Sequence, residues 1–181
     1  ANGTTYLLDL GANIECSAEQ LFQFSLMGAA LALIHGAQKP KVALLNVGSE
    51  KSKGGEAVQH AASLIAKNSD IEFFGFIEGN DIYRGQVDVI VCDGFSGNVA
   101  LKVSEGVAAF VEKTIREEIN RTLLTKILSI PASFVLKAWW KKYNPSIYNG
   151  AALIGLRKTV VKSHGGVDSF GFYNALLAAV E

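Results

Sequence analysis

Short, nearly continuous apolar runs alternate with longer amphipathic stretches along the first half of the chain. Such runs are typical of parallel strands that are covered on both faces. They predict strands at residues 6–10, 42–47, 71–77 and 87–92, and a weaker strand at 159–162. The amphipathic stretches predict helices at 18–35 and 56–67. Strands that alternate with helices in this way predict a three-layer α/β/α fold with right-handed crossovers.

Helix signals also mark the second half of the chain. Ser17 is expected to cap the helix at 18–35, because Gln20 completes a capping-box pattern. A long helix is predicted at about 98–120, followed by a second helical region at 123–142. Pro131 is expected to kink or break that region, since proline supplies no helical N–H. The pattern therefore predicts a projecting helical hairpin over about residues 98–142.

The formal net charge is zero, but the charges are unevenly distributed. Residues 1–120 hold 15 acidic and 9 basic side chains, whereas residues 121–162 hold eight basic side chains and no acidic one. Apolar residues make up 49% of the chain. A basic apolar segment after an acidic body indicates contact with something anionic, although a solvated basic face is the simpler alternative.

Several functional classes are disfavoured by the residues present. The two cysteines and three histidines have no metal-ligand spacing, so we expect no metal site and reduced thiols in a cytoplasmic protein. No apolar run is long enough to span a membrane. The P-loop and dinucleotide fingerprints are absent, so we expect no cofactor. No nucleic-acid partner is expected either. The chain opens almost directly with a strand, which suggests that an upstream portion is missing.

Candidate chemistry gathers where strands end, which is where ligands bind in open α/β sheets. Four strand ends carry polar residues beside glycines: Asp9-Leu-Gly-Ala-Asn13, Asn46-Val-Gly-Ser-Glu50, Glu78-Gly-Asn-Asp81 and Asp93-Gly-Phe-Ser-Gly-Asn98. In the last motif, glycines permit close backbone approach and the N–H groups of the following helix form an anion site. Ser96 and Asn98 add side-chain donors. The alternative is a tight turn in which Ser96 or Asn98 is an ordinary cap.

Two further segments carry basic side chains beside glycines. Lys53 lies on the loop that follows Asn46, where it either clamps phosphate or is simply solvated. Near the C-terminus, Lys162 and His164 precede Gly165 and Gly166. His164 is a candidate to donate a proton or a hydrogen bond to a thioester or phosphate, and a structural role is the alternative.

Taken in order, these motifs resemble the PlsX family of bacterial phosphate acyltransferases. The resemblance rests on residues 7–13, 24–28, 42–48 with Lys53-Gly54, 76–81, 91–98, Leu101-Lys102, Glu105-Gly106, 148–155 and 161–165. One departure is Asn149-Gly150, where the family usually has two glycines. The family also carries an N-terminal portion that has no counterpart here. The chain is therefore interpreted as the C-terminal part of a single acyltransferase domain.

The resemblance implies a Rossmann-like fold akin to isocitrate dehydrogenase and phosphotransacetylase. It implies a cytoplasmic homodimer that associates peripherally with the membrane. It also implies a reaction of phospholipid synthesis, in which an acyl carrier protein thioester and inorganic phosphate give acyl-phosphate and free carrier. The alternatives are a phosphotransacetylase-like enzyme that uses acyl-coenzyme A and a non-catalytic membrane-docking module.

The roles of the candidate residues follow from the reaction, in which the enzyme must hold two anions together: phosphate and the developing oxyanion of the thioester. Phosphate is assigned to donors at the strand ends: Gly94, Ser96, Gly97, Asn98, Asn13, Asn46 and Lys53. Lys162 and His164 are the catalytic candidates, with His164 acting on the carbonyl or the leaving thiolate. Asp81 and Asp93 are expected to orient these donors, because carboxylates repel anions.

The hairpin is expected to make two kinds of contact. Dimer contacts are predicted near the helix bases. Lipid contact is predicted near a tip around Ile130–Phe134, with Lys137 and Trp139 assigned to the same membrane or partner surface.

Overall fold

The computed structural model describes residues 4–143, 147 and 149–180. The chain divides into two compact units, Ala1–Ala108 and Ala109–Glu181. Each unit is described by itself. That both belong to a single acyltransferase domain stays a prediction.

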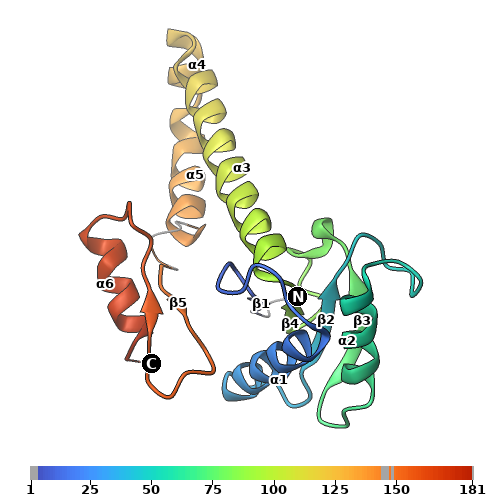
Figure 1. The fold of residues 1–181 in the computed structure, drawn as a ribbon. Coiled ribbons are helices and arrows are strands. Elements are labelled where there is room, and N and C mark those ends of the chain that lie inside the picture. The colour runs from blue at the N-terminus through green and yellow to red at the C-terminus, as the bar shows by residue number, and fades with distance from the viewer. Residues whose placement is uncertain (1–3, 144–146, 148, 181) are drawn as a thin grey trace. The chain divides into compact units, whose positions relative to one another are not determined.

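A four-stranded parallel sheet forms the centre of the first unit (Figure 1). Its strands are β1 (Tyr6–Leu8), β2 (Lys41–Leu45), β3 (Glu72–Ile77) and β4 (Val89–Val91). The order is β1-β4-β2-β3, so β4 pairs with β1 on one side and β2 on the other. The predicted α/β fold with a parallel sheet is confirmed, and the arrangement is Rossmann-like.

Two helices cover one face of this sheet, α1 (Ala18–Ile34) and α2 (Glu56–Ala66). The predicted capping box of α1 is confirmed: Ser17 N–H donates to Gln20 Oε1 at 2.9 Å, and Gln20 N–H donates to Ser17 Oγ at 3.3 Å. Gly28 allows α1 to approach β4 closely, because a Cβ there would lie 2.5 Å from Val89 Cγ1.

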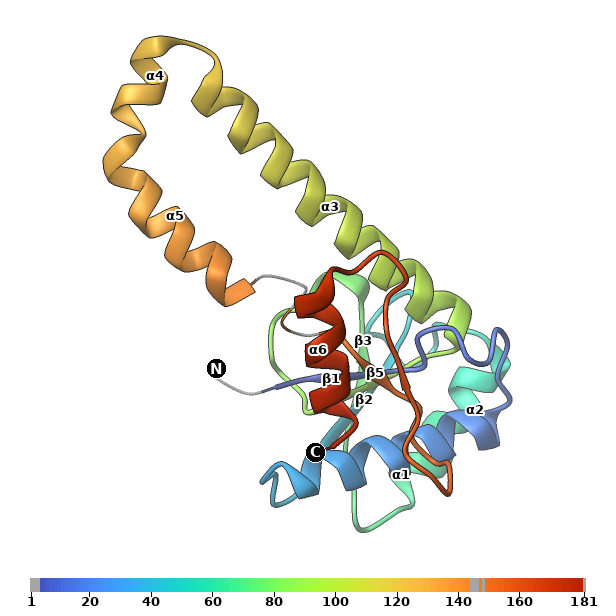
Figure 2. The same ribbon diagram turned by 90° about the vertical axis from the view of Figure 1, so that its left-hand side faces the viewer.

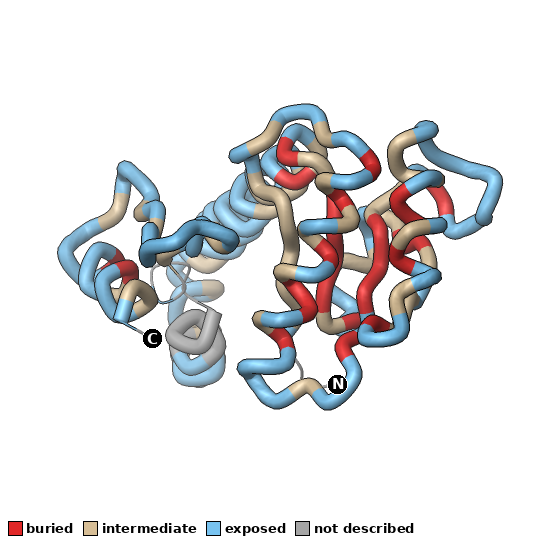
Figure 3. Tube along the Cα trace, turned by 60° about the horizontal axis from the view of Figure 1, so that its bottom comes forward, coloured by how far each residue is buried: buried red, intermediate tan, exposed pale blue. Residues whose placement is uncertain are grey.

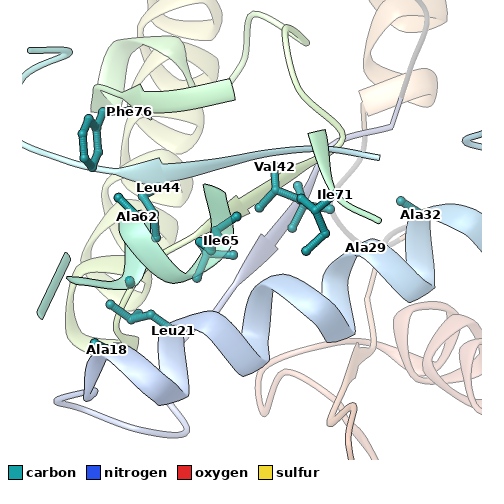
Figure 4. Close-up of a cluster of buried hydrophobic side chains, with 13 residues drawn as sticks. Ala18, Leu21, Ala29, Ala32, Val42, Leu44, Ala62, Ile65, Ile71 and Phe76 are labelled. Atoms are coloured by element: carbon teal, nitrogen blue, oxygen red, sulfur yellow. The ribbon is translucent and has the colours of Figure 1, made fainter. Parts of the chain in front are cut away.

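The main core lies between these helices and the sheet. Leu21, Val42, Leu44 and Ile65 are among its buried side chains (Figure 4). Figure 3 shows the buried residues of this unit concentrated along its central strands. Their burial supplies the main stabilisation of the unit, since apolar surface leaves water.

The opposite face of the sheet carries a smaller cluster of Ala43, Ile77, Val87 and Ile90. The segment between β3 and β4 contributes Val87 and the partly buried Ile82 to it. This segment begins with a 3₁₀ turn, η1 (Gly79–Asp81). The third layer of the predicted three-layer fold is thus represented here by the η1 segment, and a helical third layer stays a prediction.

Helix α3 (Gly94–Asn120) starts in the first unit and continues into the second. It is followed by α4 (Leu123–Leu128) and α5 (Ile130–Tyr143). The predicted interruption is confirmed, since the helix breaks at Ser129 and Pro131 lies in the first turn of α5. Proline is tolerated there, because the first N–H groups of a helix have no intrahelical acceptor.

The position expected for the tip of the hairpin was wrong, whereas lipid contact around Ile130–Phe134 stays a prediction. Figures 1 and 2 show α4 at the far end of α3, with α5 running back from it. The chain turns at Arg121 because Thr122 starts a new helix, in a capping box with Thr125. Ile130–Phe134 therefore belongs to the returning helix. The side chains of Lys137 and Trp139 lie outside the described residues.

Among its described residues, the second unit also contains a short antiparallel pair, β5 (Ala151–Ala152) and β6 (Val161–Lys162), and helix α6 (Ser169–Ala178). The weak strand predicted at 159–162 is present, but its partner β5 was not predicted. No helix in the described residues is long and apolar enough to cross a membrane.

Candidate functional site at the carboxyl ends of the strands

One edge of the sheet collects the polar residues that follow the strands. Asp9 comes just after β1, Asn46 after β2, Glu78 after β3 and Asp93 after β4. Because all four strands are parallel, their carboxyl ends lie at the same edge. This edge is the candidate site of the first unit.

The Asp9 carboxylate organises the loop that follows β1. It accepts the backbone N–H groups of Gly11 at 2.9 Å, Ala12 at 2.9 Å and Asn13 at 2.7 Å, and the side-chain amide of Asn13 at 2.9 Å. Partial burial acts to raise the pKa of Asp9, but these hydrogen bonds outweigh it and hold the pKa below its ordinary value. Asp9 is therefore ionised, and one N–H of the Asn13 amide is committed to it.

The start of α3 has no free backbone donors in its first turn. Gly94 N–H donates to the Asn13 carbonyl at 2.7 Å, and Phe95 N–H donates to the Ile14 carbonyl at 3.2 Å. Ser96 N–H and Gly97 N–H donate to the side chain and carbonyl of Asp93, at 2.7 and 3.0 Å. The expectation that these N–H groups are free to bind an anion was therefore wrong.

The two glycines of this turn serve packing. A Cβ on Gly94 would lie 2.5 Å from the Asn13 carbonyl oxygen, and a Cβ on Gly97 would overlap the Asp9 carbonyl oxygen. The loop after β1 thus packs directly on the backbone of α3. Sequence reasoning had assigned this close approach to a ligand.

Side chains of the same turn still offer donors. Asp93 accepts from the Ser96 hydroxyl at 3.1 Å, so the carboxylate orients Ser96. Asn98 is exposed beside Gly11, and its amide makes no hydrogen bond within the described residues. Asn98 is therefore the side chain of this turn that is most available to a ligand. The assignment of phosphate to Ser96 and Asn98 stays a prediction.

The loop after β2 holds a paired lysine. The Asn46 amide donates to the Lys53 carbonyl at 2.9 Å and closes the loop, helped by the positive φ of +97° at Gly54. Lys53 Nζ lies 2.7 Å from Glu50 Oε1, and the Lys53 side chain is 49% exposed. The hydrogen bond and charge of Glu50 raise the pKa of Lys53, so the lysine is cationic.

Sequence reasoning missed one cation at this edge. Arg84 Nη1 lies 2.8 Å from Asp81 Oδ1, and its side chain is 57% exposed. The other Asp81 oxygen accepts Glu78 N–H at 3.2 Å, so this carboxylate orients both the turn and the arginine. The spacing of an acid and a base three residues apart is the signal that points to this pair.

Neither thiol near this edge is a ready nucleophile. Burial, followed by the negative charges of Asp93 and Asp9, raises the pKa of Cys92 to about 12. Burial also raises the pKa of the partly buried Cys16. Both thiols are therefore protonated near neutral pH. Within the part of the chain that the structure describes, no group of three or more His, Cys, Asp or Glu side chains is arranged to hold a metal ion.

The second unit contains the other two predicted site residues. Asn149 anchors the loop after β6: its Oδ1 accepts His164 N–H at 3.0 Å, and its Nδ2 donates to Ser163 Oγ at 2.9 Å and to the Gly171 carbonyl at 2.8 Å. His164 Nδ1 accepts Gly166 N–H at 3.2 Å. In the neutral imidazole this bond leaves the proton on Nε2, so the exposed ring keeps one N–H donor.

Lys162 is exposed on β6. Both Lys162 and His164 belong to the second unit, so their action on a substrate held at the strand edge stays a prediction.

The sequence of the whole chain matches one protein family. The model described as "Fatty acid synthesis protein" covers residues 1–181. This chain belongs to that family. The resemblance to PlsX acyltransferases, drawn from the ordered motifs, is thereby confirmed.

Curated members of the fatty acid synthesis family include close relatives of this chain. A phosphate acyltransferase of Teredinibacter turnerae is 53% identical over 181 residues, which are 100% of this chain and 55% of the relative. A phosphate acyltransferase of Saccharophagus degradans is 55% identical over 181 residues, which are 100% of this chain and 53% of the relative. The chain therefore spans about half the length of these relatives.

Among solved structures, the EutD phosphotransacetylase from Staphylococcus aureus aligns with a TM-score of 0.45 and 20% identity. The alignment covers 60% of this chain and 40% of that one.

Proposed function

We propose that the protein to which this chain belongs transfers an acyl group from an acyl carrier protein thioester to inorganic phosphate. The products are acyl-phosphate and free carrier, and the reaction serves phospholipid synthesis. The observation that carries this proposal is the family match over residues 1–181. Relatives that are 53% and 55% identical to this chain are named phosphate acyltransferase.

The chemistry requires positioning more than a protein nucleophile. A phosphate oxygen attacks the thioester carbonyl carbon, the carbon–sulfur bond breaks, and the leaving thiolate takes up a proton. Phosphate is itself a nucleophile, so the reaction needs no nucleophilic side chain. This agrees with the Cys92 thiol, which is protonated near neutral pH and is therefore a poor nucleophile. The main contributions expected from the enzyme are orientation of the two substrates and donors aimed at the developing charge.

Donors for this reaction are available in both units. Asn98 offers a free amide, and Lys53 and Arg84 bring positive charge to the same strand edge. In the second unit, Nε2–H of His164 is the donor for the carbonyl oxygen or the thiolate, with Lys162 close by in sequence. Asp81 and Asp93 hold Arg84 and Ser96 in place, the orienting role proposed for them.

The acyl donor is proposed to be a carrier protein because of the basic segment. Residues 121–162 carry eight basic side chains and no acidic one. Such a surface favours an acidic protein partner through electrostatic attraction. The alternative is a phosphotransacetylase-like reaction that uses acyl-coenzyme A.

The same segment supports peripheral membrane contact, and α3 before it supports homodimer formation. Leu123, Leu124, Ile127 and Leu128 of α4 are between 62% and 82% exposed, with Lys126 among them. Exposed apolar side chains beside basic ones favour the interface of an anionic membrane. Exposed apolar residues on the later turns of α3, such as Phe110 and Ile115, are proposed to contact a second subunit. We propose a cytoplasmic enzyme that docks on the membrane through α4.

One assay tests the proposed reaction and its alternatives. The full-length protein is mixed with phosphate and either acyl carrier protein thioester or acyl-coenzyme A, and acyl-phosphate and free thiol are measured. We expect thiol release that requires phosphate and is faster with the carrier protein. Faster turnover of acyl-coenzyme A would favour the phosphotransacetylase-like reaction. Liposome binding without thioester cleavage would favour a docking module.

A further inference from the structure

An uncharged groove runs along α3 in the first unit. Its volume is about 810 Å³, and it lies between α3 and the residues that follow β3. Phe95, Val99, Val103 and Val107 line it from α3, and Ile82 and Tyr83 line it from the other side. The four α3 residues are spaced four apart, so they share one face of the helix.

These side chains are apolar but exposed to water. Phe95 is 64% exposed, Val103 58% and Val107 55%. A contiguous apolar surface that is left open in this way marks a binding site for an apolar ligand or partner. None of the residues that line the groove is charged.

The groove opens onto the candidate site. Ser96 and Gly79 line it, and they belong to the turns that follow β4 and β3 at the carboxyl edge of the sheet. Charged and polar groups therefore gather at one end of the groove, where Asp93 holds Ser96. The rest of the lining is mostly apolar, with Tyr83 and Ser104 as its polar side chains, and the Ser104 hydroxyl donates to the Ala100 carbonyl. This arrangement matches a ligand with a reactive polar head and a hydrocarbon tail.

We propose that this groove binds the hydrocarbon chain of the acyl donor, with the thioester carbonyl at the Ser96 end. The inference rests on the proposed acyl transfer and adds a chain-binding subsite to it. From Ser96 to Val107 the helix advances about 16 Å. An extended chain advances about 3.5 Å for every three bonds, so this length accommodates roughly 14 chain bonds. A long fatty acyl chain therefore fills the groove, whereas a short one leaves the Val107 end empty.

Val99 and Val107 lie at different distances from Ser96, so substitutions at the two positions should affect ligands of different chain length differently. Val99→Phe and Val107→Phe are made in the full-length protein, and binding of octanoate and hexadecanoate is measured by equilibrium dialysis. Each displaced methylene costs about fourfold in affinity, and a phenyl ring displaces roughly two. We expect Val107→Phe to lower the ratio of hexadecanoate to octanoate affinity about sixteenfold, which corresponds to two displaced methylenes. Val99→Phe, nearer the site, should weaken both ligands and change the ratio less.

Val111→Phe is the matched control, because Val111 is an exposed valine of the same helix that does not line the groove. Both affinities should stay within about twofold of the parent. Equal effects of all three variants, or no effect of Val107→Phe, would overturn the proposal. A change in oligomeric state with unchanged hexadecanoate binding would also overturn it, since the face would then be a subunit interface.

Turnover of octanoyl and hexadecanoyl thioesters separates this proposal from the proposed function. If Val107→Phe weakens hexadecanoate binding as expected but the parent cleaves no thioester, the groove is supported as a chain-binding site and the proposed acyl transfer is rejected. If the parent cleaves thioesters in a phosphate-dependent way and Val107→Phe keeps the parental chain-length preference, the groove is rejected as the chain-binding site and the proposed acyl transfer is supported.

Discussion

The side-chain oxygen of Asn149 accepts the backbone N–H of His164 at 3.0 Å. The same side chain donates to Ser163 Oγ and to the Gly171 carbonyl of α6, so it joins the loop after β6, which carries His164, to α6. Asn149 was noted in the sequence only as a departure from two glycines. In the structure it fixes the backbone from which the His164 imidazole projects.

Removal of this anchor is expected to misplace His164. Asn149→Ala should lower turnover of the full-length protein by between about tenfold and a hundredfold, since small displacements of catalytic groups are costly. Asn149→Asp keeps the acceptor for His164 N–H and should retain more turnover than Asn149→Ala. Turnover is measured well below the melting temperature of each variant. Parental turnover in Asn149→Ala would show that the anchor is not needed.

His164 itself is expected to act on the substrate through Nε2–H. His164→Gln should lower turnover roughly 10²–10⁴-fold if the imidazole is a general acid. The melting temperature should change little, because the side chain is exposed and its imidazole accepts a hydrogen bond from the nearby Gly166 N–H. A variant with parental turnover and a lowered melting temperature would assign His164 a structural role.

Asn98 is expected to contribute to phosphate binding. Asn98→Ala should raise the phosphate concentration needed for half-maximal turnover about tenfold, since one hydrogen bond to a charged group is lost. The fold should persist, because the amide makes no hydrogen bond in the described structure. Asn120→Ala, at the other end of α3, is the control and should leave the phosphate requirement unchanged. An unchanged requirement in Asn98→Ala would remove Asn98 from the site.

Gly97 is expected to be structurally required. Gly97→Ala places a methyl group against the Asp9 carbonyl and should lower the free energy of unfolding by about 1–3 kcal/mol. Gly106→Ala is the matched control, since a Cβ there meets no atom within 4 Å. It should raise the free energy of unfolding by about 0.5–1 kcal/mol, because alanine favours a helix. Denaturant unfolding of both variants measures the difference. Equal stability of the two would contradict the packing role.

Membrane contact is expected to depend on α4. Leu124→Asp and Ile127→Asp should weaken co-sedimentation with anionic liposomes more than Phe134→Asp does, because α4 forms the tip. Binding should fall at high salt, since each basic residue near an anionic surface contributes about 1 kcal/mol through screened attraction. The oligomeric state of each variant is checked separately. If Phe134→Asp has the larger effect, the membrane anchor is the segment Ile130–Phe134 of α5, as predicted from the sequence, and not α4. If the variants become monomers, the apolar surface is a subunit interface.

Local patterns in the sequence determined much of the first unit. Nearly continuous apolar runs located β1 to β4, because strands covered on both faces are mostly apolar. The charged residues Lys41 and Glu72 are the first residues of β2 and β3. The Ser17–Gln20 capping box and the break near Pro131 also depend only on residues close in the chain. The ordered motifs were sufficient to identify the family.

Tertiary structure decided which backbone and side-chain groups are free to bind. The N–H groups of Gly94 and Phe95 looked available, but the Asn13 and Ile14 carbonyls accept them from a loop about 80 residues earlier in the chain. The placement of β4 between β1 and β2 brings that loop to α3. Sequence patterns report the neighbours of a residue along the chain. Hydrogen bonds across the sheet edge depend on strand order, which no local pattern specifies.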